Sequence, residues 1–153
     1  LAAHSDVAMF VSPLGRARDT AALIAQAFPC KCDIVYDDRL MEVGMGSWDG
    51  MTDGEIARGS PNARKGRGQN EWFFHSPDGE TYEAMATRVT AALETVRAHH
   101  AKTRIIVSHG VTGRLLRGIH AKLDKDVVLD LDTPQDALFH LVPDGSVTRI
   151  ECR

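Results

Sequence analysis

The sequence predicts an α/β fold with a mainly parallel sheet flanked by helices. Short apolar runs typical of buried strands occur at 7–11 and 104–107, and a helical pattern follows each of them. Strands that alternate with helices favour a parallel sheet covered on both faces. The chain has 153 residues, of which 43% are hydrophobic and 25% are charged, which is enough for one globular domain with a real core.

The first part of the chain predicts a strand, a helix and a second strand. The run 7–11 is continuously apolar, as in a strand buried on both faces. The alanine-rich segment 19–28 favours a helix, which would stop at Pro29 because proline cannot continue it. Residues 32–36 then read as a second strand.

The middle of the chain predicts loops. Residues 37–78 are polar and rich in glycine, so we expect little regular structure there. Loops of this kind often carry function, and we interpret 43–78 as a lid over a site. An aromatic cluster at 72–75 is interpreted as core or lid packing, with lining of the substrate pocket as the alternative.

The second half returns to regular patterns. Apolar residues recur at helical spacing over 81–99, and a buried strand is expected at 104–107. A further helix follows almost at once, with Leu115, Leu116, Ile119 and Leu123 on one stripe. Strands at 137–142 and 146–151 flank a Pro-Asp-Gly turn and predict a hairpin at the edge of the sheet.

Charge and composition exclude several classes of function. The net charge of −3 is atypical of a general nucleic-acid binder, and no apolar run approaches the ~18 residues of a membrane span. No cluster of histidine, cysteine and carboxylate residues has metal-ligand spacing, and no dinucleotide loop follows a strand. The three cysteines have neither metal-ligand spacing nor the pattern of a disulfide framework and are interpreted as reduced thiols, so we expect a cytoplasmic protein without metal or cofactor.

Two segments of the sequence combine features that favour the binding of an anion. Residues 12–20 and 107–113 each follow a buried strand and lead into a helix. Ligands bind at the carboxyl ends of strands in open α/β sheets, and helix N-termini attract negative charge. Arg16 or Arg18 would add bidentate recognition of a phosphate, and His109 lies in the second turn.

Four segments together resemble one family. Residues 12–21 (Ser-Pro-Leu-Gly-Arg-Ala-Arg-Asp-Thr-Ala), 39–50 (an acidic loop with Gly-Ser-Trp-Asp-Gly), 76–81 (Ser-Pro-Asp-Gly-Glu-Thr) and 107–110 (Val-Ser-His-Gly) resemble signatures of the histidine phosphatase superfamily, also called phosphoglycerate mutase-like. They occur in the family's order, and the resemblance covers the chain from about Val7 to its end. It implies a three-layer sandwich and a two-step phosphoryl transfer through a phosphohistidine.

The family's nucleophile is missing from the sequence. It lies in an Arg-His-Gly triplet on a first, central strand, and the sequence contains no such triplet. His4 precedes the strand at 7–11 and is no substitute. Because the chain also begins at Leu1 without a methionine, we expect 1–153 to be a histidine phosphatase domain that lacks its N-terminal strand and is inactive as it stands.

The resemblance implies a role for five residues. Arg16 matches the arginine that clamps the phosphate, and Glu42 matches the proton donor to the leaving oxygen. His109 would donate a hydrogen bond to the phosphoryl oxygens. Ser108 and Gly110 would let the backbone approach the phosphate, and the N–H groups after Gly110 would face it.

Three functions remain open on the sequence. The leading hypothesis is a phosphatase that hydrolyses a small anionic phosphate monoester, and the second is a phosphoglycerate mutase. The third is a non-catalytic domain that retains the phosphate pocket. The identity of the substrate depends on a lid without a specific motif. Loss of a central strand would expose sheet edges and favour association, with a homodimer as a candidate form.

Overall fold

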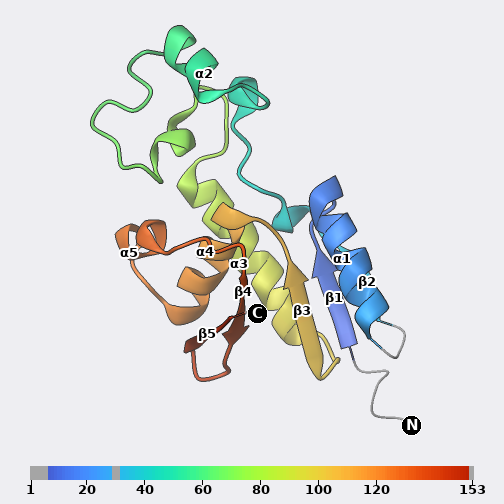
Figure 1. The fold of residues 1–153 in the computed structure, drawn as a ribbon. Helices are drawn as coiled ribbons and strands as arrows, with labels where there is room; N and C mark the ends of the chain where they lie inside the picture. The colour runs from blue at the N-terminus through green and yellow to red at the C-terminus, as the bar shows by residue number, and fades with distance from the viewer. Residues whose placement is uncertain (1–6, 29–31, 152–153) are drawn as a thin grey trace. The chain divides into compact units, whose positions relative to one another are not determined.

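A computed structural model gives the fold of residues 7–28 and 32–151 (Figure 1). The chain divides into two compact units. The sheet unit consists of Leu1–Glu42 and Arg88–Leu116. The loop unit consists of Val43–Thr87 and Arg117–Arg153.

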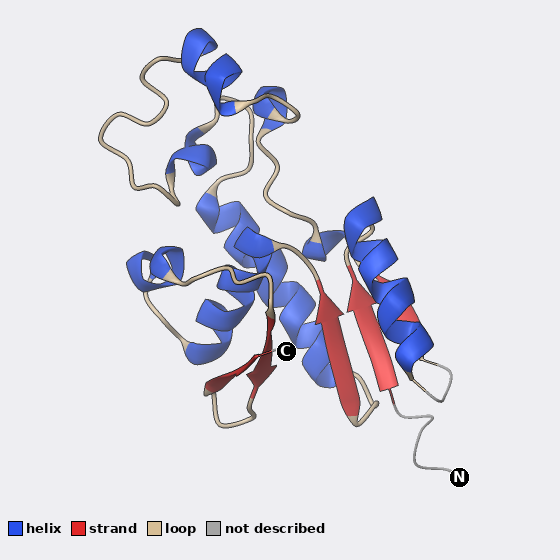
Figure 2. Cartoon of the chain, viewed as in Figure 1, coloured by secondary structure: helices blue, strands red, loops and turns tan. Residues whose placement is uncertain are grey.

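The sheet unit contains a three-stranded parallel sheet in the order β2-β1-β3 (Figure 2). Its strands are β1 (Val7–Val11), β2 (Asp33–Tyr36) and β3 (Thr103–Val107). β1 is central and pairs in parallel with both neighbours. The predicted strands and their parallel arrangement are therefore confirmed.

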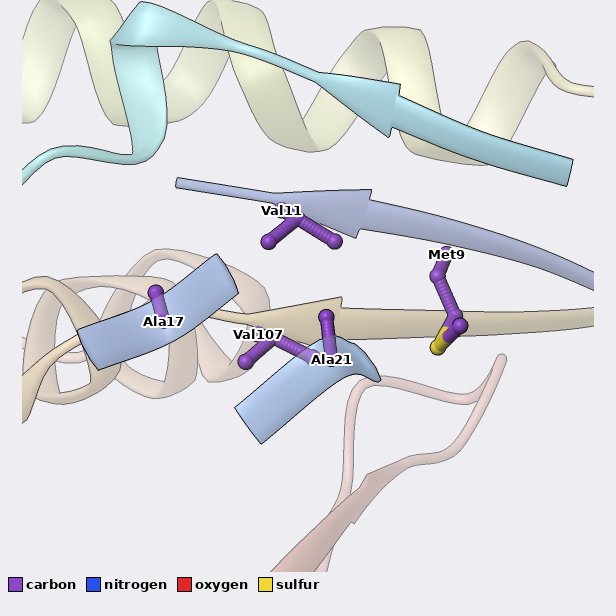
Figure 3. Packing of buried hydrophobic residues seen from close by; sticks show 5 residues of the cluster. All are labelled: Met9, Val11, Ala17, Ala21 and Val107. Carbon is purple, nitrogen blue, oxygen red and sulfur yellow. The ribbon is translucent and has the colours of Figure 1, made fainter. Parts of the chain in front are cut away.

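Helix α1 (Gly15–Ala27) covers one face of this sheet. Ala17 and Ala21, one turn apart, pack with Met9, Val11 and Val107 in one buried cluster (Figure 3). Small side chains at these two positions allow the helix backbone to approach the strands closely. The helix begins at Gly15, earlier than the predicted Asp19, so Arg16 lies in its first turn.

The opposite face of β1 is buried too. Ala8 and Phe10 alternate with Met9 and Val11 and therefore point away from α1, and both are at most 1% exposed. The Phe10 ring meets the edge of His99, which directly follows helix α3 (Tyr82–Ala98), with 5.3 Å between the ring centroids. The prediction of an α/β fold with helices flanking a parallel sheet is thus confirmed.

The two outer strands are less buried than β1. All four residues of β2 are exposed, and in β3 only Val107 is buried while Thr103 and Arg104 are exposed. The prediction of a buried strand at 104–107 is therefore confirmed for Val107, holds in part for the half-buried Ile105 and Ile106, and was wrong for Arg104. β2 and β3 are the edges of this sheet, and only its central strand is covered on both sides.

The predicted loops contain more regular structure than expected. Helix α2 (Asp53–Gly59) begins with a capping box in which Thr52 and Glu55 exchange hydrogen bonds, a pattern visible in the sequence. Short 3-10 turns occur at Asp38–Leu40, Gly46–Trp48 and Trp72–His75. The loop unit has a small core of its own, formed by Trp48, Ile56, Ala63 and Trp72.

The C-terminal part contains helices α4 (Gly110–Ala121) and α5 (Lys125–Asp130) and the predicted hairpin of β4 (Ala137–Leu141) and β5 (Val147–Glu151). This hairpin forms a two-stranded sheet of its own within the loop unit, and its predicted place at the edge of the parallel sheet stays a prediction. Side chains hold it inside the loop unit: the Arg117 guanidinium lies 4.0 Å from the centre of the Phe139 ring, and Arg149 pairs with Asp132.

Candidate active site

The candidate site lies where β1 and β3 end. The two strands are parallel neighbours, so the residues that follow them emerge at the same edge of the sheet. The Ser12 backbone N–H donates to the Val107 carbonyl at 2.9 Å, which extends the pairing by one residue. Ser12 is fully buried, and the turn of residues 12–20 therefore lies beside that of residues 107–113.

His109 contacts Ser12 and Arg16. Its Nε2 atom lies 2.8 Å from the Ser12 Oγ atom, and its Nδ1 atom accepts a hydrogen bond from Arg16 Nε at 3.0 Å. Arg16 is exposed and His109 is half-buried. Two predicted site residues that are 93 positions apart in the sequence are thus in direct contact.

Glu42 occupies the N-terminus of α4. Its Oε2 atom accepts from the Val111 backbone N–H, and its Oε1 atom accepts from that of Thr112, both at 3.1 Å. A carboxylate is favourable here because the first N–H groups of a helix lack partners within the helix. The expectation that these N–H groups face a phosphate was therefore wrong, since Glu42 uses them.

Two residues that the sequence reasoning missed hold the backbone before Glu42. The Thr112 hydroxyl donates to the Met41 carbonyl at 2.8 Å. Arg88 Nη1 donates to the carbonyls of Arg39 and Met41 at 2.7 and 2.9 Å, and its Nη2 donates to that of Glu42. The available signal was a basic residue next to the apolar stripe of α3, beside Val89.

An ion pair shapes the same loop from its other end. The Arg39 guanidinium binds both carboxylate oxygens of Asp37, and Asp37 Oδ1 also accepts from the Arg39 backbone N–H. The hydrogen bonds from Arg39 lower the pKa of Asp37. Arg39 further donates to the Thr95 hydroxyl of α3 at 3.0 Å, which ties the loop to that helix.

The surroundings of His109 favour its neutral form. Burial is the main cause that lowers its pKa, and the positive charges of Arg16 and Arg88 act in the same direction. Glu42 opposes them. A neutral imidazole is the form that can accept a hydrogen bond from Arg16.

The remaining candidate residues lie at three different places: after β3, at the start of α4 and beside β2. Ser108 is half-buried directly after β3, and Gly110 is exposed and begins α4. The Arg18 guanidinium lies 5.2 Å from the centre of the Tyr36 ring, so it points to β2 and not to His109. His4 lies outside the described residues.

The arrangement suits an anion. An exposed guanidinium and an imidazole meet at the carboxyl edge of the sheet, and a carboxylate is held nearby on α4. Within residues 7–28 and 32–151, no group of three or more histidine, cysteine or acidic side chains could hold a metal ion. In the same part of the chain, no helix is both long and apolar enough to span a membrane.

Part of the chain is similar in sequence to a protein of Escherichia coli. Over 101 residues it is 38% identical to the probable phosphoglycerate mutase GpmB of Escherichia coli O1:K1. This stretch covers 65% of the chain and 46% of the relative, so the match spans about half of the relative's length.

Solved structures share the fold. Bacillus stearothermophilus YhfR superposes with a TM-score of 0.76 at 23% identity, over 98% of this chain and 74% of that one. The mycobacterial glucosyl-3-phosphoglycerate phosphatase Rv2419c, solved with inorganic phosphate, gives a TM-score of 0.69 at 21% identity, over 96% and 75%. The family model of the histidine phosphatase superfamily (branch 1) matches residues 1–152. Because this match covers nearly the whole sequence, the chain belongs to the histidine phosphatase superfamily.

Proposed function

We propose that the chain is the greater part of a phosphatase that hydrolyses a small anionic phosphate monoester through a phosphohistidine. The contact between Arg16 and His109 at the carboxyl edge of the sheet carries this proposal. Arg16 would bind two phosphoryl oxygens with its planar fork. Ser108 and Gly110 would leave room for the phosphate beside them, as small residues at the end of β3.

Glu42 would serve as the proton donor to the leaving oxygen and then as the base for water. Its carboxylate is held at a defined place by the N–H groups of Val111 and Thr112, which supports this role because a general acid must be positioned. The nucleophilic histidine would belong to a segment N-terminal to Leu1, since the sequence holds no Arg-His-Gly. By itself the 153-residue chain would then be inactive.

Kinetics with a generic aryl phosphate test the proposal. A protein extended by the natural upstream residues should hydrolyse the ester, and the 153-residue chain should not. In the extended protein, Arg16→Lys should lower kcat/KM by about 10³-fold, because arginines that stabilise phosphoryl transfer are worth ~10³–10⁵. Arg18→Lys, two positions away, is the matched control and should retain activity. Comparable turnover by the short chain would refute the account of the nucleophile.

A phosphoglycerate mutase is the second candidate, favoured by the name of the 38% identical relative. Phosphorus NMR with 3-phosphoglycerate separates the two, because a mutase transfers the phosphoryl group to the 2-hydroxyl and a phosphatase releases inorganic phosphate. If the extended protein binds phosphate but does neither, the site is a non-catalytic phosphate-binding site.

Two further predictions concern the rest of the chain. The lid assigned to 43–78 stays a prediction; the core around Trp48 and Trp72 supports it, because it lets this segment hold a shape of its own. A homodimer also stays a prediction. The exposed apolar residues of β2, Ile34, Val35 and Tyr36, support it. Sedimentation of the wild type beside Val35→Lys tests it, since a charge on the edge should dissociate a dimer formed there.

A further inference from the structure

Each ring nitrogen of His109 lies within hydrogen-bond distance of another side chain. Arg16 Nε lies 3.0 Å from Nδ1, and the Ser12 Oγ atom lies 2.8 Å from Nε2. Ser12 is fully buried and Arg16 is exposed, so one partner belongs to the interior and the other to solvent. The ring thus connects the end of β1 to the first turn of α1.

The proton on the ring can be assigned from these contacts. An arginine keeps the hydrogen on Nε at every accessible pH, so Nδ1 must be the acceptor. A neutral imidazole has one N–H, which therefore lies on Nε2 and donates to the Ser12 hydroxyl oxygen. The Ser12 hydroxyl also accepts from the Leu14 backbone N–H at 3.3 Å.

This arrangement excludes a proton on Nδ1 while Arg16 donates to it. The charged groups that act on His109 are Arg16 from α1, Arg88 from α3 and Glu42 from the loop before α2. Two of the three are cations, and burial adds to their effect. An anion that accepts from the Arg16 guanidinium would draw it from Nδ1 and supply negative charge beside the ring.

We propose that Ser12 is a positioning residue that holds His109 through Nε2, and that binding of a tetrahedral oxyanion to Arg16 is accompanied by uptake of one proton from solvent at Nδ1. The imidazolium then donates from both nitrogens, to Ser12 and to the anion. Nδ1 thus acts as a switch: it accepts from Arg16 while the ring is neutral and becomes a donor only when the anion is bound. The inference rests on the proposed function only for the view that a phosphoryl group is the natural anion.

Nitrogen NMR of the histidine rings tests this without any assay of activity. Sulfate is the probe, because it stays a dianion over the range in which histidine titrates. In the 153-residue chain, the His109 signals, identified by their loss in His109→Gln, should show the Nε2–H tautomer. Saturating sulfate should raise the midpoint of the His109 titration by about one pH unit, as expected for a nearby opposite charge.

Calorimetry gives an independent count of the protons. Sulfate binding should take up about half a proton at the pH midway between the two midpoints, the most that a shift of one pH unit allows, measured in buffers of different ionisation enthalpy. By linkage, a shift of one pH unit corresponds to about a tenfold loss of sulfate affinity above the upper midpoint. An Nδ1–H tautomer in the free chain, or sulfate that leaves the His109 titration unchanged, would overturn the proposal.

Variants separate the two partners. Ser12→Ala should populate the Nδ1–H tautomer and reduce the sulfate-linked shift, whereas Ser12→Thr, which keeps the hydroxyl, should restore both. Arg16→Met should raise the midpoint in the free chain and abolish the shift. Arg18→Met on the same helix is the control and should behave as wild type. If Ser12→Ala does not fold, the two arginine variants still test the proposal. The proposal is refuted if Arg16→Met and Arg18→Met show the same His109 midpoint and the same sulfate-linked shift. If the tautomer is as inferred but the protein extended by the natural upstream residues does not hydrolyse the ester, the proposed function alone is refuted.

Discussion

The Oε1 atom of Glu42 accepts hydrogen bonds from both the backbone N–H and the hydroxyl of Thr112, at 3.1 and 3.2 Å. The hydroxyl has a single hydrogen, which it shares between Glu42 Oε1 and the nearer Met41 carbonyl at 2.8 Å. A loop residue is thereby fixed against a helix that lies 70 positions further along the chain. The first N–H groups of α4 hold the carboxylate in place. The carboxylate in turn gives these N–H groups the hydrogen-bond partner that they lack within the helix.

Replacing Thr112 by valine should destabilise the chain. The side chain is fully buried, and the nearly isosteric change leaves the Met41 carbonyl without this donor. We expect a loss of about 1–2 kcal/mol in the free energy of unfolding, measured in urea. Thr20→Val is the matched control, because that residue is exposed and its hydroxyl donates to the Arg16 carbonyl of the same helix. Equal losses for both variants would contradict the role given to Thr112.

Replacing Arg88 by methionine should loosen the loop before Glu42. Its guanidinium donates to three carbonyls of this loop, those of Arg39, Met41 and Glu42. Bonds from a charged donor are worth about 1.5–3 kcal/mol each in place, and solvent replaces part of this, so a net loss of about 2 kcal/mol is expected. Hydrogen exchange should accelerate over 39–42. Arg18→Met should change neither stability nor exchange there, and protection that survives in Arg88→Met would be evidence against the clamp.

The stability of the chain should depend on His109 as the pH changes. Its pKa is lowered in the folded state, so the unfolded chain binds more protons between that value and the ordinary 6.5. The free energy of unfolding should therefore rise with pH through this window and fall on acidification. His109→Gln keeps an N–H donor for Ser12 but cannot titrate. Urea unfolding from about pH 5 to 7.5 should show a steeper slope in the wild type than in the variant; parallel slopes would contradict the lowered pKa.

Two glycines of α4 should respond in opposite ways to alanine. A Cβ at Gly118 would clash with Val128 Cγ2 of α5, and Val128 is buried. A β-branched side chain cannot turn away easily, so Gly118→Ala should cost about 1–3 kcal/mol. A Cβ at Gly113 meets nothing within 4 Å, and Gly113→Ala should stabilise by up to ~1 kcal/mol.

Thermal unfolding of Gly118→Ala, Val128→Ala and their double variant tests the clash at position 118. The double variant Gly118→Ala with Val128→Ala should lose less than the sum of its two single variants, because the clash disappears with the methyl groups. Additive losses would mean that the close approach of α4 and α5 does not limit position 118.

The order of elements in the sheet unit was predictable because local patterns determine it. The apolar run at 7–11 and the alanines of 17 and 21 specify a strand and a helix that must bury their apolar faces against each other. The burial of 104–107 was not predictable in the same way. Apolar character shows that a strand can be buried, but the position in the sheet decides whether it is, and β3 lies at an edge.

The structure of residues 37–78 was predictable only in part. Glycine content indicated loops, and the Thr52–Glu55 capping box that starts α2 was visible but short. The core of Trp48 and Trp72 joins residues from separate loops, with ring centroids 5.8 Å apart, and no local periodicity describes such a contact.

The sequence by itself determined the family, the α/β class and the identity of the polar residues at two strand ends, because motifs and hydrophobic patterns are local. The tertiary structure alone decided that Arg16 donates to His109, that Ser12 takes the other ring nitrogen and that Glu42 caps α4. Parallel pairing of β1 with β3 brings residues 12 and 109 to one edge. Side-chain protonation and capping depend on which polar groups meet there, and that is set by the fold and not by spacing in the chain.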